Sequence, residues 1–300
     1  MENDIFQLQY ALDTFYFLVC GALVMWMAAG LAMLEAGLVR TKNTTEILTK
    51  NVALFAIACI MYMVCGYMIM YGGDLFLSTI TGDGVAGAEE PATYAPSADF
   101  YFQVVFVATA MSIVSGAVAE RMKLWSFFMF AVVLTAFIYP IQGFWNWGGG
   151  FLTESFGYFD FAGSGTVHLC GAAAALAGVL VVGPRKGKYG PGGQVNAIPG
   201  ANLPLAALGT LILWLGWFGF NGGSELKVSD VGEANAVALV FVNTNMAAAG
   251  GLVLAWLFSR LWFGKADLTM ALNGALAGLV AITAEPQTPE PIQATLIGGV

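Results

Sequence analysis

The chain has 300 residues, of which 58% are hydrophobic and 10% are charged, and its formal net charge at pH 7 is −8. Because soluble domains carry about 25% charged residues, this composition excludes a water-soluble globular protein. It also excludes intrinsic disorder, which needs low hydrophobicity, and the negative charge argues against nucleic acid as a partner. We therefore interpret the chain as an integral membrane protein that lies in a lipid bilayer.

Long apolar runs follow one another along the chain. A helix needs about 20 mostly apolar residues to cross a bilayer, whereas the strands of membrane barrels have about 10 residues and alternate in polarity. The runs therefore predict an all-α protein with about eight membrane-spanning helices and the start of a ninth near Ile292. In chain order the predicted spans are 15–38, 52–71, 100–119, 125–144, 165–182, 203–220, 234–258 and 268–284.

The charges between these runs predict the orientation. The N-terminal sequence MENDIFQLQY is acidic, and we expect the first apolar run, which is too long for a signal peptide, to be retained. We expect the longest irregular stretch, 72–99, to be a solvated external loop. Lysine and arginine accumulate in cytoplasmic loops, so the basic residues predict a multi-pass protein with its N-terminus outside. Apart from Lys227 they all fall in odd-numbered loops: Arg40, Lys42, Lys50, Arg121, Lys123, Arg185, Lys186, Lys188, Arg260 and Lys265.

Ionisable residues in or beside the spans are expensive in a bilayer and are candidates for function. They are Glu35 near the end of the first span, Asp160 just before the fifth, and His168 within the fifth. His168 is the only histidine. It is either a hydrogen-bonded packing residue or a neutral, pore-lining ring with one donor and one acceptor nitrogen, suited to a small polar solute.

Two aromatic, glycine-rich stretches lie at the predicted outer edge of the membrane, FWNWGGG at 144–150 and WLGWFGFNGGS at 214–224. Their rings either form an interfacial belt or attract a cation in an external vestibule, and composition does not decide between the two. The chain shows no nucleophile–base pair and no metal-ligand cluster, and its cysteines lack zinc or disulfide spacing. We therefore predict no enzyme, no cofactor and no metal.

Four motifs carry a resemblance to a known family. They are GLAMLEAGLVR at 30–40, GAVAER at 116–121, DFAGSGTVH at 160–168 and WFGFNGGS at 217–224. In this order, and over nearly the whole chain, they resemble the signatures of ammonium transporters. The stretches around Trp147 and Trp217 are similar to the ammonium-transporter branch rather than the Rh branch.

The resemblance implies a fold of eleven helices in two inverted halves, an arrangement common among transporters, assembled as a homotrimer with one pore per subunit. Residues 1–300 would form one membrane domain of this fold, without its last helices and any tail. The family's second pore histidine is absent, and we expect it on a helix beyond residue 300.

The resemblance also assigns roles at the outer side of the pore. It places Phe106, Trp147 and Ser224 at an external site that recruits ammonium. It makes Phe106 and Phe220 a stacked aromatic gate beneath that site.

Three further residues receive roles below or beside the vestibule. Asp160 would order the nearby backbone and assist recruitment, and Trp217 would support the vestibule. His168 would be the first of two facing pore histidines.

The function that the resemblance implies is uptake of ammonium, with methylammonium as its analogue, across the cell membrane. Neutral ammonia would pass an apolar pore after deprotonation, which excludes K⁺ because K⁺ has no proton to lose. A separate route for the proton is left open. The alternative is an ammonium-sensing domain of a signalling protein. The family also suggests a cytosolic PII-type signal protein as a partner on the inner face.

Overall fold

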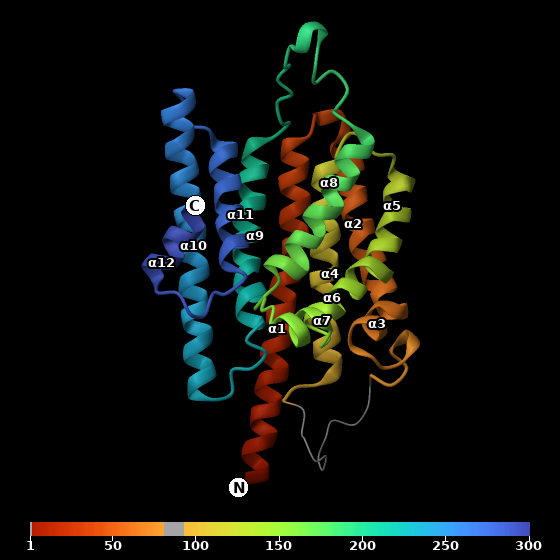
Figure 1. Ribbon diagram of the computed structural model, residues 1–300, viewed down its shortest axis with the longest axis vertical. Helices are drawn as coiled ribbons and strands as arrows, with labels where there is room; N and C mark the ends of the chain where they lie inside the picture. The colour runs from red at the N-terminus through yellow and green to blue at the C-terminus, as the bar shows by residue number, and fades with distance from the viewer. Residues whose placement is uncertain (1, 81–92) are drawn as a thin grey trace.

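The predicted spans fold as helices that run along one long axis of the molecule (Figure 1). The structure is a computed structural model that describes residues 2–80 and 93–300. Within these ranges it holds no strand, only an isolated bridge between Tyr189 and Val195. Seven helical segments of the described chain are long and apolar enough to cross a membrane. The prediction of an all-α, multi-pass membrane protein is confirmed.

π-Helical turns lie within two of the spans, at 62–66 and 134–138, and a third turn at 164–169 begins the next span. In chain order the helices are α1 (Glu2–Leu38), α2 (Thr44–Met61), α3 (Tyr67–Tyr71), α4 (Pro96–Val118), α5 (Leu124–Val133), α6 (Tyr139–Asn146), α7 (Phe151–Phe156), α8 (Cys170–Val182), α9 (Leu203–Gly223), α10 (Val231–Phe263), α11 (Leu268–Ile282) and α12 (Pro291–Gly299).

The helix bounds differ from the predicted spans mainly at the ends. The first helix begins at Glu2 rather than at 15, and α4 begins at Pro96, inside the stretch expected to be a loop. Apolar runs mark the part of a helix that lies in hydrocarbon, so polar turns at either end escape them. The predicted span 268–284 is the 15-residue α11, which is shorter than the other spans. Three acidic residues of the loop expected at 72–99, Asp83, Glu89 and Glu90, lie outside the described residues.

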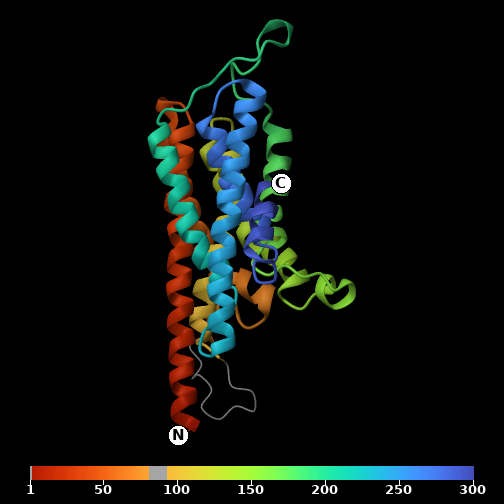
Figure 2. The same ribbon diagram turned by 90° about the vertical axis from the view of Figure 1, so that its left-hand side faces the viewer.

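Small residues let the helices approach closely, as expected of membrane bundles. Helices α1 and α9 lie side by side (Figure 2), and a Cβ at Gly209 would be 2.5 Å from the backbone nitrogen of Leu34. Between α10 and α11, a Cβ at Gly278 would be 2.3 Å from the carbonyl oxygen of Ala247. The glycines at these crossings therefore serve helix packing.

Charge separates the molecule into two ends, which we call the basic end and the acidic end. The segments 39–43, 119–123, 183–202 and 264–267 lie at the basic end, the upper end in Figure 1. The segments 72–80, 147–163 and 224–230 lie toward the acidic end, on the side of the N-terminus. Besides Lys227, one basic residue departs from this pattern: we expected Lys50 in a loop, but it is buried within α2. The Glu35 carboxylate pairs with it there, and the sequence around Lys50 alone does not identify this partner.

Candidate functional site

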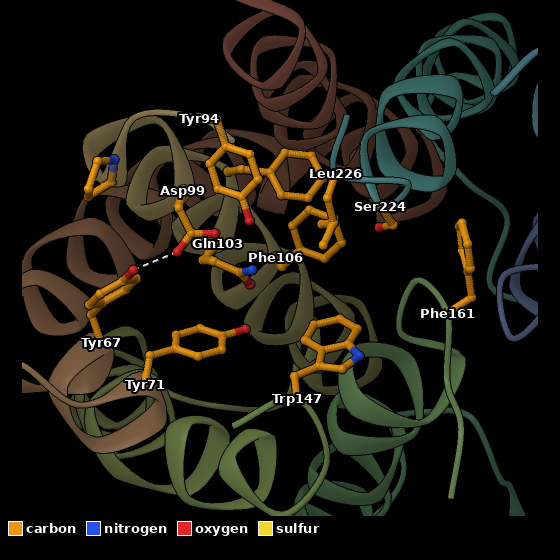
Figure 3. Close-up of a pocket in the computed structure, with 12 residues that line it drawn as sticks. Tyr67, Tyr71, Tyr94, Asp99, Gln103, Phe106, Trp147, Phe161, Ser224 and Leu226 are labelled. Atoms are coloured by element: carbon orange, nitrogen blue, oxygen red, sulfur yellow. Dashed lines mark hydrogen bonds between the residues drawn. The ribbon is translucent and has the colours of Figure 1, made fainter. Parts of the chain in front are cut away.

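A cavity of about 500 Å³ at the acidic end brings together the residues predicted to recruit ammonium. Phe106 comes from α4, Trp147 follows α6, and Ser224 ends α9. Figure 3 shows these side chains around one space. Residues far apart in the sequence therefore line one aromatic pocket, and its other lining residues are Tyr67, Tyr71, Tyr94, Pro96, Asp99, Phe102, Gln103, Phe161 and Leu226.

A pair of stacked phenyl rings lies at one wall of this cavity. The ring centroids of Phe106 and Phe220 are 4.1 Å apart with an interplanar angle of 30°, and both side chains are buried. Trp147 meets Phe106 edge-on at 6.1 Å. Ser224 lies one turn after Phe220 and donates its hydroxyl hydrogen to the Phe220 carbonyl at 2.9 Å. This bond leaves the lone pairs of the Ser224 oxygen free to accept an N–H from a ligand.

His168 lies directly behind the phenyl pair. Its ring centroid is 5.3 Å from that of Phe220, and it stacks on Trp217 at 4.9 Å and 19°. Its Nδ1 is 3.0 Å from the carbonyl oxygen of Gly163. Because a carbonyl only accepts, Nδ1 carries the hydrogen, and Nε2 of the neutral ring is left as an acceptor.

Trp217 does not line the cavity, although we expected it to support the vestibule. It lies one turn before Phe220 on α9 and packs against His168. Its indole N–H donates to the Thr283 hydroxyl at 2.7 Å. The indole therefore contacts the imidazole ring directly.

The Asp160 carboxylate organises the backbone between the cavity and His168. It accepts backbone N–H groups from Gly163 at 3.1 Å, Gly165 at 2.9 Å and Thr166 at 2.7 Å. The Asp160 carbonyl accepts the Trp147 indole N–H at 2.9 Å. No ion pair of the described residues includes Asp160.

Gly163 joins the Asp160 carboxylate to the imidazole, since its N–H binds the one and its carbonyl binds the other. Its φ of +109° favours glycine. A Cβ there would lie 2.6 Å from Val167 and 3.0 Å from the Trp147 ring. The π-helical turn that follows lets the N–H groups of both Val167 and His168 donate to the Gly163 carbonyl.

The basic end holds a different set of polar residues. Within the bundle, Lys50 Nζ lies 3.3 Å from a carboxylate oxygen of Glu35 and 5.1 Å from the Phe127 ring centroid. In the α4–α5 loop, Glu120 accepts hydrogen bonds from Arg40 at 2.9 Å and Arg185 at 3.0 Å. Burial acts to raise the pKa of Glu120, but the hydrogen bonds outweigh it and lower the pKa to about 2.

Sequence reasoning missed the polar wall of the cavity. Asp99 was counted as a loop residue, but it lies in the first turn of α4 and lines the cavity beside Tyr67. The spacing of Asp99, Gln103 and Phe106 places all three on one face of a helix, and this signal was available once α4 was known to begin before residue 99. Among residues 2–80 and 93–300, no group of three or more His, Cys, Asp or Glu could hold a metal ion.

Comparison with known proteins gives the family of the chain. The model of the Ammonium Transporter Family matches residues 15–300. The chain belongs to the ammonium transporter family. It is 44% identical over 298 residues to the ammonium transporter Amt2 of Archaeoglobus fulgidus, covering 96% of this chain and 62% of that protein. It is 40% identical to a putative ammonium transporter of Synechocystis sp., covering 99% of this chain and 68% of that protein.

Solved structures of ammonium transporter family proteins share the fold. A structure named Sensor Amt Protein superposes with a TM-score of 0.90 at 36% identity, and the match covers 100% of this chain and 73% of that one. The crystal structure of Candida albicans Mep2 gives a TM-score of 0.84 at 26% identity, covering 98% and 65%. The chain therefore spans about two thirds of the length of the family members it matches.

Proposed function

We propose that this family member transports ammonium through a pore that runs from the acidic-end cavity past Phe106 and Phe220 to His168. One observation carries the proposal: a cavity of aromatic rings, a stacked phenyl pair and a buried histidine lie in direct succession. We infer that residues 1–300 act as one membrane domain in this process.

The chemistry of the cavity, of the phenyl pair and of the histidine suits ammonium. Trp147 and Phe106 present π-systems that attract a cation by about 0.5–2 kcal/mol each, and the Ser224 oxygen can accept an N–H. The phenyl pair offers no replacement for the water around an ion, and moving a bare charge past it costs several kcal/mol. Ammonium avoids this cost by transferring a proton to water in the cavity and passing as ammonia, which K⁺ cannot do because it has no proton to lose.

His168 then serves the neutral molecule. With the Nδ1 hydrogen directed at Gly163, Nε2 is an acceptor for an N–H of ammonia. Asp160 keeps Gly163 in place and so acts as a positioning residue for the imidazole. The proton that is left behind follows a separate route.

Four further properties follow from the family and from the charge pattern. We propose that the acidic end and the N-terminus face outward, since basic loops face the cytoplasm. We further propose the cell membrane as the location, a homotrimer as the assembly, and a cytosolic PII-type signal protein as a partner of the basic end.

Uptake of labelled methylammonium into proteoliposomes that hold the full-length protein, including any helices beyond residue 300, tests the transport function. We expect saturable uptake that ammonium inhibits and K⁺ does not, and an about hundredfold loss in His168→Ala, because Nε2 is the only imidazole acceptor in the chain. His168→Glu should instead admit K⁺, since a fixed negative charge stabilises a bare cation. Wild-type rate and selectivity in a folded His168→Ala protein would contradict the proposed pore.

Ammonium sensing is the second candidate function, and the close match to the structure named Sensor Amt Protein favours it. A sensor would bind ammonium in the same cavity without moving it across the membrane. Calorimetric binding of methylammonium by the purified chain, combined with no uptake by the proteoliposomes, would establish this function in place of transport.

A further inference from the structure

The acidic-end cavity contains a carboxylate that no cation neutralises. Asp99 lines the cavity, and its Oδ2 accepts the Tyr67 hydroxyl hydrogen at 2.5 Å. None of the ion pairs found among the described residues includes Asp99. A carboxylate that is withdrawn from bulk water without a partner charge attracts a cation into the same space.

Aromatic hydroxyl groups surround this carboxylate. Figure 3 shows the Tyr71 and Tyr94 side chains directed into the space that Asp99 faces, with the Gln103 side chain beside them. The walls are held by ring packing: Tyr94 stacks on Phe17 with centroids 4.3 Å apart, and Tyr67 meets Tyr71 at 5.4 Å. The phenolic oxygens and the Gln103 amide oxygen can accept hydrogen bonds, and the ring faces attract positive charge.

This arrangement selects the class of ligand. Divalent cations such as Ca²⁺ and Mg²⁺ require several carboxylate or carbonyl oxygens, and among residues 2–80 and 93–300 Asp99 is the only carboxylate that lines the cavity. One negative charge with hydroxyl acceptors and aromatic faces matches a small monovalent cation that donates N–H groups. Ammonium and primary alkylammonium ions have these properties.

Within the same cavity, the position of Asp99 is displaced from the site formed by Phe106, Trp147 and Ser224. Asp99, Gln103 and Phe106 follow one face of α4, and Asp99 precedes Phe106 by seven residues. At 1.5 Å per residue this is a displacement of about 10 Å along the helix toward the acidic end. An ion at Asp99 therefore lies one step before the aromatic site.

We propose that Asp99, with Tyr67, Tyr71 and Tyr94, forms an outer capture subsite for ammonium or a primary alkylammonium ion. The hydrated ion binds first at Asp99. It then moves past Gln103 to Trp147 and Ser224, where cation–π attraction replaces the attraction of the carboxylate. The identity of the physiological ion rests on the proposed function, whereas the binding of a small organic ammonium ion at Asp99 does not.

Asp99→Asn is the test, because asparagine keeps the shape and can still accept the Tyr67 hydrogen bond while it removes the charge. We expect the half-saturating methylammonium concentration for uptake to rise about tenfold with little change in the maximal rate. Asp99→Glu should retain most of the affinity. The matched control is Glu154→Gln, which removes one charge from exposed α7 at the same end and should behave as wild type.

Calorimetric titration of the purified protein with methylammonium separates this subsite from the transport function. The expected result is an about tenfold weaker association in Asp99→Asn, whether or not the wild-type chain shows uptake. Equal affinities in wild type and a folded Asp99→Asn protein would overturn the subsite. So would an equal loss in Glu154→Gln, since that would show a general field effect rather than a local site.

Discussion

At the basic end the Glu120 carboxylate lies within 3.0 Å of two guanidinium groups, whereas at the acidic end backbone N–H groups hold the Asp160 carboxylate. The contrast extends to other residues of the two ends. Glu35 is paired with Lys50, but Asp99 accepts from the Tyr67 hydroxyl and forms no ion pair within the described residues.

The difference decides which end can collect cations. An ion pair cancels charge, so Glu120 and Glu35 add no net negative charge at the basic end. Hydrogen bonds from N–H and O–H groups stabilise a carboxylate but leave its net charge in place. The acidic end therefore keeps a negative potential around its aromatic cavity, and such a potential raises the local concentration of cations.

The largest expected effect comes from breaking the pairing at the basic side. Lys50→Met leaves the buried Glu35 carboxylate without its partner and should lower the free energy of unfolding by about 3–5 kcal/mol. The double variant Glu35→Gln/Lys50→Met removes both charges and should regain most of that loss. Denaturant unfolding of the purified protein measures both. Wild-type stability in Lys50→Met would show that the pair is not required there.

An intermediate effect comes from removing an aromatic face at the acidic end. Trp147→Leu deletes a cation–π partner worth about 0.5–2 kcal/mol, so the half-saturating methylammonium concentration should rise about 2- to 30-fold and discrimination against K⁺ should weaken. Trp145→Leu is the control, because Trp145 packs on Phe151 and does not line the cavity. Competition assays with both variants decide the point, and identical behaviour of the two would count against aromatic recruitment.

The smallest expected effect is a dependence of the free energy of unfolding on pH. Burial, followed by hydrogen bonding to Glu233 and its negative charge, raises the pKa of Glu225 from 4.5 to about 7. The folded protein therefore binds this proton more tightly than the unfolded chain. The stability that Glu225 contributes is complete below pH 4.5 and is lost as the pH rises through 7.

Glu120 has the opposite sign, because its pKa falls to about 2. Its contribution is complete above pH 4.5 and is lost as the pH falls toward 2. Unfolding midpoints between pH 2 and 8 should therefore lose the decline near pH 7 in Glu225→Gln and the decline at low pH in Glu120→Gln. A variant that keeps the wild-type slope in its own range would show that its carboxyl group does not titrate as described.

The sequence alone determined the helical membrane fold, the alternation of charge between the two ends, and the segments that carry the site. These properties are local: about 20 apolar residues define a span, and the motifs at 160–168 and 217–224 are continuous in the chain. The sequence also indicated that Phe106, Trp147 and Ser224 belong to one site, through resemblance to the family.

Only the tertiary structure decided which groups meet. Trp217 stacks on His168, Lys50 is buried against Glu35, and Asp99 faces the cavity instead of solvent. In each case the outcome depends on how two or more helices pack, and no pattern within one segment carries that information. The physical reason is that burial and neighbouring charge, which set the chemistry of a side chain, are properties of the assembled bundle.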